Sequence, residues 1–319
     1  MLLFGDRKFL KTPFVNEDEL EQVILSNYEY LFGPSSVYLP KSKITTADGI
    51  GTIPDGFVID IEKKIWYVVE IELISHGVYE HIVKQVTKQL NAAAQAVTKQ
   101  KIEDLTVVQY DTDRTTKEKF DEANIREINV RKVVSDILKS SPIVGMPIDD
   151  INNDLRDYSK TLKNGMKTWI VAKYVELGNP ENIIYEFPEE YKPEIDTEET
   201  FFESNENTSS SKIALYNIVL MDLVRSGLLS PPELLYMEYK PRKGQGKKKY
   251  QATILKDGSL SFHNQIFSAP SNAALAGIQD AGSDRKTVNG WTAWKKEDGR
   301  TLAQLRDVFM EEQIELNNS

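Results

Sequence analysis

The sequence predicts two domains: an N-terminal domain of the α/β class, with helices flanking a sheet, and a small C-terminal α+β domain. The 319 residues exceed the length of one average domain. Helix-like and strand-like patterns alternate up to residue 180. The stretch Pro180–Ser211 is rich in Pro, Glu and Asn and ends in a run of serines, which is a linker composition. We therefore divide the chain into 1–180, 181–211 and 212–319.

The first elements of the N-terminal domain are predicted to be a helix and three strands. Residues Glu17–Leu31 form the helix, because apolar residues recur on one face and Asn16 is suited to cap the first turn. The strand-like runs that follow are Val37–Ile44, Phe57–Ile61 and Ile65–Leu73. The short connection Glu62–Lys64 predicts that the last two runs pair as a hairpin.

The rest of this domain is predicted in less detail. Apolar residues three and four apart indicate a long helix over Val78–Lys99. The remaining predicted elements are a strand at Leu105–Tyr110, helices at Lys132–Leu138 and Ile151–Leu162, and a strand at Lys167–Leu177. Beyond these helices, residues 111–165 are left unassigned.

The C-terminal domain is predicted to open with an amphipathic helix, Ile213–Ser226, that ends at Gly227. Two strands follow, Tyr250–Leu255 and Leu260–Phe262, and the intervening Asp257-Gly258 is a strong hairpin signal. The last predicted elements are a short helix at Ser271–Ile278, capped by Ser271, and a final helix at Thr301–Glu315.

The composition excludes several classes of protein. The chain has no cysteine, which excludes disulfides and thiolate metal sites and suits a reducing cytoplasm, where we expect the protein. No apolar run approaches the roughly 18–20 residues that span a bilayer, and the first residues lack the long apolar core of a signal peptide. Neither a Gly-x-Ser-x-Gly nor a P-loop pattern is present.

The net charge of −10 is unevenly distributed. Positions 181–208 hold 10 acidic residues and 1 basic residue, whereas positions 209–319 hold 15 basic and 12 acidic residues. The acidity therefore lies mostly in the predicted linker, and the C-terminal third is mildly basic. Because local fields decide phosphate binding, the total charge does not exclude nucleic acid as a partner.

Three carboxylates are predicted to meet at one edge of the N-terminal sheet. Asp55 opens the second strand, and Glu70 and Glu72 lie two apart on the third, so the period of a strand puts both on one face. Because apolar residues flank them, their burial requires a partner, and a divalent cation such as Mg²⁺ or Mn²⁺ is a natural one. The alternative is a two-sided strand whose glutamates simply face solvent.

The order of these elements resembles the PD-(D/E)XK nuclease superfamily. Pro54-Asp55 and Glu70-Ile71 match its Pro-Asp and acid-x-Lys pattern, but Glu72 stands where the family has Lys. The resemblance implies a mixed sheet flanked by helices, in which Asp55 and Glu70 are catalytic and ligate Mg²⁺ or Mn²⁺. It implies that Glu72 is a further ligand or the base that orients water. Because Glu72 departs from the family's Lys, the alternative stays open that this chain is a superfamily member that does not cleave DNA.

The resemblance implies roles for two helical residues as well. Glu21 corresponds to the acid that many of these nucleases place before the core strands as a metal ligand; the alternative is a solvated helix residue. Gln85 lies on the long helix, where superfamily members often carry a polar residue that supports catalysis. His76 and His81 are interpreted as structural or exposed; the alternative is a catalytic role. Two lysines of the first strand face either DNA or bulk solvent, namely Lys41 and Lys43.

The C-terminal domain resembles the RAMA domain, which accompanies restriction enzymes and adenine methyltransferases. The residues that carry this resemblance include Gly227-Leu228-Leu229, Tyr250–Leu255, Phe267–Ser271, Asn289-Gly290-Trp291 and Gly299–Leu302. Family members usually have Ser-Pro-Ser without an inserted alanine, so Ala269 is a small departure.

Basic and aromatic residues of this domain predict contact with DNA. A Gly-containing loop, Pro241–Lys249, carries several lysines that can follow phosphates; the alternative is a merely soluble hairpin connection. Trp291 and Trp294 are interpreted as core residues or as a stacking surface for a base. The predicted DNA contacts are Lys243, Lys247, Lys248, Lys249, Asn289 and Trp291.

Together the two resemblances imply a metal-dependent DNA endonuclease of prokaryotic restriction or antiphage defence. Phosphate chemistry is insensitive to sequence, so a separate domain is expected to read the DNA, modified or unmodified. Cleavage of both strands needs two active sites, so we expect a homodimer. A further possible partner is a methyltransferase or another component of the defence system. The alternative function is an inactive nuclease-fold protein that serves as a DNA-binding or regulatory subunit.

Overall fold

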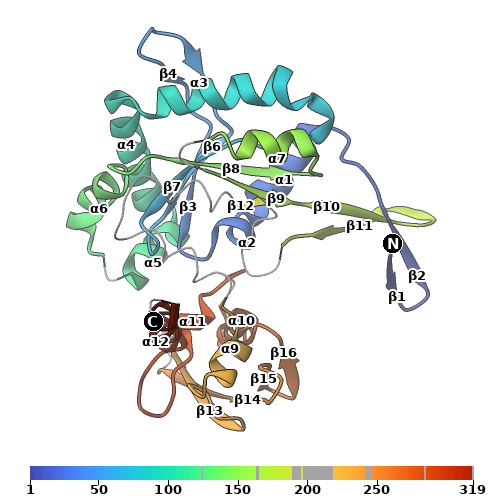
Figure 1. The fold of residues 1–319 in the computed structure, drawn as a ribbon, viewed down its shortest axis with the longest axis vertical. Helices are drawn as coiled ribbons and strands as arrows, with labels where there is room; N and C mark the ends of the chain where they lie inside the picture. Colours follow the sequence, from blue (N-terminus) through green and yellow to red (C-terminus); the bar gives the residue numbers. More distant parts are fainter. Residues whose placement is uncertain are drawn as a thin grey trace. The chain divides into compact units, whose positions relative to one another are not determined.

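The computed structural model describes residues 1–123, 125–162, 165–188, 195–196, 218–240, 246–283 and 285–317. The chain divides into two compact units, Met1–Glu203 and Ser204–Ser319 (Figure 1). Within the described ranges, no helix is long and apolar enough to cross a membrane.

The N-terminal unit is built on a six-stranded sheet of order β12-β9-β8-β7-β6-β3. Its strands are β3 (Ser36–Pro40), β6 (Gly56–Asp60), β7 (Ile65–Val69), β8 (Ile143–Ile148), β9 (Met166–Ile170) and β12 (Ile195–Asp196). Strands β7, β8 and β9 are parallel to one another, whereas β3, β6 and β12 pair antiparallel to their neighbours. The predicted α/β class with a mixed sheet is therefore confirmed, as is the β6–β7 hairpin.

Helices cover both faces of this sheet (Figure 1). Ile24 and Ile71 belong to the buried cluster on one face, and Val68 and Ala93 to the cluster on the other. The helices are α1 (Glu17–Asn27), α2 (Glu29–Phe32), α3 (Val83–Ala93), α4 (Ala96–Thr112), α5 (Arg114–Glu122), α6 (Val130–Ile137) and α7 (Asn153–Ser159). Shorter helical turns are η1 (Ile74–His76), η2 (Val78–Ile82, of π type) and η3 (Glu127–Asn129).

The first helix begins where its capping residue predicts. The Asn16 side chain accepts a hydrogen bond from the Glu19 amide at 2.9 Å. Three acidic residues occupy the first turn, where they complement the helix dipole. The single helix predicted over Glu17–Leu31 is in fact α1 and α2, because Tyr28 closes the first and leads into the second.

A second sheet, of order β1-β2-β10-β11, extends from the body of the same unit (Figure 1). Its strands are β1 (Leu2–Phe4), β2 (Arg7–Lys11), β10 (Ala172–Glu176) and β11 (Asn179–Glu186). Val171 separates β9 from β10, so the single strand predicted at Lys167–Leu177 is divided between two sheets. Strand β11 occupies residues that composition assigns to a linker, so the N-terminal unit continues beyond residue 180.

Two other predictions need correction. The strand predicted at Leu105–Tyr110 is wrong, since these residues lie in α4. Ile102, Thr106 and Tyr110 are buried four residues apart, which is helical spacing, so packing overrides the β-branched composition. The strand predicted at Val37–Ile44 ends at Pro40, and a separate hairpin of β4 (Ile44–Thr45) and β5 (Gly51–Thr52) follows.

The long helix predicted over Val78–Lys99 is also interrupted. It opens with the π-type turn η2, continues as α3 and breaks at Ala94 and Gln95 before α4 starts. The helices predicted at Lys132–Leu138 and Ile151–Leu162 are confirmed as α6 and α7.

Strand β8 was not predicted, although it is central to the sheet. All six of its residues are buried. Its sequence contains Gly145 and Pro147, which normally argue against a central strand. Gly145 is required here, because a Cβ atom at this position would press on the Phe32 ring.

The C-terminal unit is a four-stranded antiparallel meander with helices around it, which confirms the α+β prediction. Its strands are β13 (Glu233–Tyr239), β14 (Lys248–Ile254), β15 (Leu260–Phe262) and β16 (Gln265–Phe267), in that order. Its helices are α9 (Leu220–Arg225), α10 (Pro270–Asp280), α11 (Gly290–Ala293) and α12 (Leu302–Asn317). Helix α9 ends before Gly227, which has a φ of +80°, as predicted, but it begins after Val219 rather than at Ile213, and residues 213–217 lie outside the described part of the chain.

The start of α10 differs from the prediction. Ala269 is its N-cap, Pro270 is in the first turn, and Ser271 does not cap the helix. Ser271 Oγ instead accepts a hydrogen bond from the Gly290 amide at 3.2 Å. The Trp294 indole donates to the Pro270 carbonyl at 3.0 Å. The motif residues of this unit therefore join α10 to α11.

Candidate active site

The backbone beyond β7 holds two glutamates in an extended conformation beside β8. The Glu70 amide donates to the Gly145 carbonyl at 3.0 Å, and the Glu72 amide donates to the Pro147 carbonyl at 3.2 Å. Ile71 between them lies in the buried cluster of the α1 face. Both glutamates accordingly lie on the face that α3 covers, as strand periodicity predicts.

Asp55 reaches the same stretch of backbone from the start of β6. Its amide donates to the Val69 carbonyl at 3.1 Å. Its Oδ2 accepts a hydrogen bond at 2.8 Å from the Ile71 amide, which lies between the two glutamates. The charge of Asp55 contributes to the raised pKa of both glutamates, so the three acids share one region at the end of β7. Among the described residues, however, the group of three potential ligands whose atoms lie within 4.8 Å of one another contains Glu72 but neither Asp55 nor Glu70.

Lys41 links Asp55 to Glu21. Its Nζ lies 2.7 Å from Glu21 Oε2 and 3.0 Å from Asp55 Oδ1. Burial lowers the pKa of Lys41, but its hydrogen bonds to Glu21 and Asp55 outweigh this and raise the pKa above its ordinary value. Glu21 therefore lies one side chain away from Asp55. Lys41, which directly follows β3, pairs with both acids while about half of its side chain stays exposed.

Glu70 is the most deeply buried acid of the group, with 1% of its surface exposed. Gln85 Nε2, on α3, donates to Glu70 Oε2 at 2.7 Å. Glu70 Oε1 has no hydrogen-bond partner among the described residues. Burial and the neighbouring charges of Asp55 and Glu72 raise the pKa of Glu70 to about 10, against the lowering effect of Gln85.

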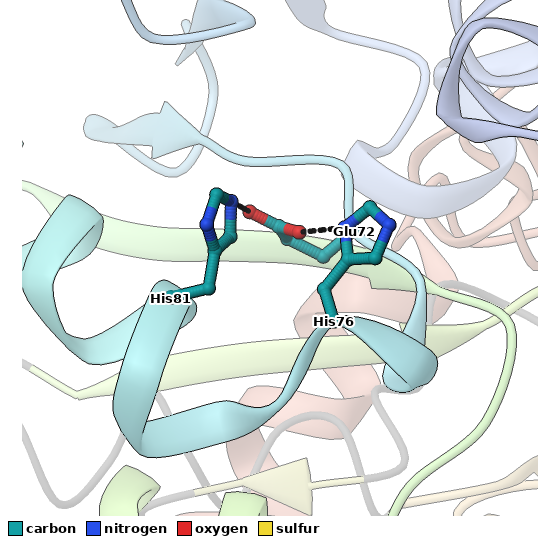
Figure 2. A group of neighbouring side chains, drawn as sticks. All are labelled: Glu72, His76 and His81. Carbon is teal, nitrogen blue, oxygen red and sulfur yellow. Dashed lines mark ion pairs between the residues drawn. The ribbon is translucent and has the colours of Figure 1, made fainter.

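Glu72 is also buried, with 2% exposed, and faces a second acid and two histidines. Burial and a hydrogen bond with Glu17 raise the pKa of Glu72 to about 9. His76 Nδ1 lies 3.5 Å from Glu72 Oε2, and His81 Nε2 lies 3.6 Å from Glu72 Oε1 (Figure 2). His76 Nδ1 also lies 2.5 Å from Glu17 Oε1.

Sequence reasoning missed part of this arrangement. The sequence gives Glu17 no role beyond the start of the first helix, and it predicts that the histidines are structural or exposed. The spacing of Glu72 and His76, followed by Gly77 in a left-handed conformation, was the available signal for a turn that folds back on the strand. Lys43 is exposed, and its carbonyl accepts a hydrogen bond from Lys101 Nζ.

In the C-terminal unit, the predicted DNA-contacting lysines are paired with acids. Lys247 and Lys249 lie 3.1 and 3.3 Å from the carboxylate of Glu238, and Lys248 Nζ lies 3.7 Å from Asp280 Oδ2. Lys247 and Lys249 stay mostly exposed, so their pairs are weak and open to exchange. Lys243 lies outside the described residues.

Asn289 and Trp291 have structural roles. The Asn289 side chain caps α11 by accepting from the Trp291 amide at 3.1 Å. Trp291 is 6% exposed, lies in the core, and has the Arg306 guanidinium over its ring. Its ring therefore packs in the core, which is one of the two alternatives given above, and its contact with DNA stays a prediction.

Comparison with protein families identifies the C-terminal part of the chain. Residues 202–315 match the family model described as Restriction Enzyme Adenine Methylase Associated, or RAMA. The chain carries a RAMA domain. The match confirms the resemblance seen in the sequence, and it covers less than half of the chain. No curated protein matches the chain.

Proposed function

We propose that the protein is a metal-dependent DNA endonuclease, in which the N-terminal unit cleaves and the RAMA domain reads the DNA. The observation that carries the proposal is that Asp55 accepts a hydrogen bond from the Ile71 amide, which lies between two almost fully buried glutamates. A carboxylate kept out of water without a compensating partner destabilises the fold, so its retention favours a ligand.

The donor atoms suit Mg²⁺ or Mn²⁺. Asp55 and Glu70 offer carboxylate oxygens, which hard divalent ions prefer, and Glu70 Oε1 lacks a hydrogen-bond partner within the described part of the chain. Asp55 Oδ1 is held by Lys41, which an ion would replace as its partner. Such an ion activates water and offsets charge on a phosphodiester. Gln85 orients Glu70, and Glu21 keeps Lys41 next to Asp55.

The RAMA match supports a role in restriction or antiphage defence, because its description links the domain to restriction enzymes and adenine methylases. We propose that Lys247 and Lys249, whose side chains are exposed, and the neighbouring Lys248 contact phosphates. A partner methyltransferase fits the same context.

We further propose a homodimer, because cutting both strands needs two active sites. The β1-β2-β10-β11 sheet supports it with exposed apolar side chains, among them Leu3, Phe4, Ile183 and Ile184. A groove beside Phe4 and Ile183 lies on the same sheet. Sedimentation equilibrium of the wild type and of Phe4→Asp tests this; a wild-type monomer at assay concentration contradicts it.

The rival is a DNA-binding or regulatory protein that has lost cleavage. Glu72 in place of the family's Lys, and the ion pair between Lys41 and Asp55, favour this alternative. It keeps the same fold and the same DNA-reading domain, so only an activity measurement separates the two.

The test is cleavage of matched unmodified, adenine-methylated and cytosine-modified DNA with Mg²⁺ or Mn²⁺. Glu70→Gln keeps the shape of the side chain and removes its charge, and we expect cleavage to fall by at least about 100-fold. Glu127→Gln, an exposed acid on η3, is the matched control and should cut as the wild type does.

Three outcomes separate the proposals. Cutting by the wild type and Glu127→Gln but not by Glu70→Gln supports the nuclease, and the preferred substrate shows what the RAMA domain reads. DNA binding without cutting by any form supports the rival. Preferential cutting of RNA overturns DNA as the substrate.

A further inference from the structure

A carboxylate and two imidazoles form a cluster next to the oxygen site of Asp55 and Glu70. The ligand atoms of Glu72, His76 and His81 all lie within 4.8 Å of one another. Figure 2 shows both rings flanking the Glu72 carboxylate, one on each side, from the segment that follows it in the chain.

The distances are those of ligands that share an ion rather than of hydrogen bonds. His76 Nδ1 and His81 Nε2 lie 3.5 and 3.6 Å from the two Glu72 oxygens. An N–H···O hydrogen bond spans about 2.7–3.2 Å. Two ligands each about 2.0–2.2 Å from a tetrahedral ion are roughly 3.3–3.6 Å apart. The observed separations therefore fit a metal ion between the carboxylate and the rings.

The buried carboxylate is a second, independent indication of a ligand. Glu72 is 2% exposed, and its Oε2 lacks a hydrogen-bond partner in the part of the chain that the structure describes. Glu17 adds a second acid at the same point, since its Oε1 contacts His76 Nδ1. Glu17 is partly exposed, but its negative charge adds to the cost of keeping the buried Glu72 ionised, which a cation would offset.

Short, ordered turns hold the two histidines in place. The Ile74 amide donates to Asp149 Oδ1 at 2.8 Å, which anchors the start of η1. Gly77, at a φ of +71°, reverses the chain between the histidines, and the π-type turn η2 carries His81. Helical turns of π type are frequent at functional sites.

We propose that Glu72, His76 and His81 bind a divalent transition-metal ion of the Zn²⁺ type, at a position distinct from the oxygen site of Asp55 and Glu70. Imidazole nitrogen suits Zn²⁺, Fe²⁺ and Ni²⁺, whereas Mg²⁺ takes oxygen ligands. This site needs no nuclease activity to exist. It binds its ion whether or not the protein cleaves DNA.

The test is metal binding by the full chain. Zn²⁺ binding is measured by calorimetry, and Co²⁺ binding by its visible absorption. We expect one high-affinity ion. His76→Asn and His81→Asn should each weaken binding by more than about 100-fold, beyond the 10–100-fold effect of losing an outer-sphere partner. Both histidines are well exposed, so these variants should keep the wild-type circular dichroism spectrum and unfolding temperature.

His263 is the matched control, because the chain has three histidines and this one is exposed in the other unit. His263→Asn should bind Zn²⁺ as the wild type does. The double variant Asp55→Asn, Glu70→Gln should keep Co²⁺ absorption while losing any Mg²⁺-dependent cleavage, which separates this site from the proposed nuclease.

Three results overturn the inference. The first is a wild type that binds neither Zn²⁺ nor Co²⁺. The second is binding that persists in the variant with both His76→Asn and His81→Asn. The third is loss of binding in His263→Asn, since the ion would then lie in the C-terminal unit.

Discussion

The candidate site of the N-terminal unit and the motif residues of the C-terminal unit differ in how their burial is compensated. Glu70 and Glu72 are almost fully buried, yet each has one oxygen without a hydrogen-bond partner among the described residues. In the RAMA domain, Asn289 caps a helix and Trp291 packs in the core. The two buried acids are therefore candidates for a cation, whereas Asn289 and Trp291 are held by contacts within their own unit.

The largest effect is expected at Lys119, a buried charge with a full set of partners. Its Nζ lies 2.6 Å from Glu29 Oε1 and donates to Tyr28 Oη and the Ser36 carbonyl. Lys119→Met leaves Glu29 without this partner, so the free energy of unfolding should fall by about 3–5 kcal/mol in urea titrations. Lys117→Met, exposed on the same helix, is the control. If the two variants have equal free energies of unfolding, the three contacts of Lys119 do not offset the burial of its charge.

Gly290→Ala tests the joint between α10 and α11. An added Cβ atom would fall on the Pro270 carbonyl group, which is backbone and cannot turn aside. We expect the free energy of unfolding to fall by about 1–3 kcal/mol, measured by urea denaturation followed at the tryptophans. Gly246→Ala should be neutral, because no described atom lies within 4 Å of a Cβ there. A stable Gly290→Ala variant would contradict the close approach of the two helices.

Glu70→Gln should stabilise the metal-free protein, unlike the two changes above. Glutamine keeps the acceptor for Gln85 and is always neutral, whereas Glu70 must take up a proton on folding at pH 8 because its pKa rises from 4.5 to about 10. We expect the free energy of unfolding to rise by about 0.5–2 kcal/mol at pH 8, measured with a chelator present. A destabilised variant would mean that the carboxylate is compensated after all.

The stabilisation by Glu70→Gln is expected to depend on pH. The pKa of Glu70 in the folded state, about 10, lies above that of an unfolded chain, so folding favours the protonated carboxyl. The contribution of Glu70 to the free energy of unfolding is complete below a pH of about 4.5 and is lost as the pH rises toward 10. The advantage of Glu70→Gln should therefore be large at pH 8 and absent near pH 4, as thermal unfolding at both values will show.

The smallest effect on stability is expected from Lys247→Gln combined with Lys249→Gln. Both side chains are exposed and share Glu238, so unfolding should change by less than about 0.5 kcal/mol. If both contact phosphates, the slope of log affinity against log salt should fall by about 1.8. An unchanged slope in a DNA-binding titration would remove them from the interface.

Local features of the sequence were enough to predict much of the fold. The Asn16 cap, the β6–β7 hairpin and the shared face of Glu70 and Glu72 follow from neighbouring residues, and the structure has all three. The RAMA resemblance rests on motif residues whose spacing is preserved along one stretch of chain, and the family match confirms it. These are properties of short segments, which the order of residues largely determines.

The tertiary structure alone decided the features that join distant segments. Strand β8 was hidden by Gly145 and Pro147, yet its carbonyls hold the backbone of both glutamates. Lys41 reaches Asp55 and Glu21, and Glu17 reaches His76, across elements that no local pattern aligns. Such contacts depend on which strands become neighbours in the sheet, and that choice is made by packing of the whole core rather than by the preferences of single residues.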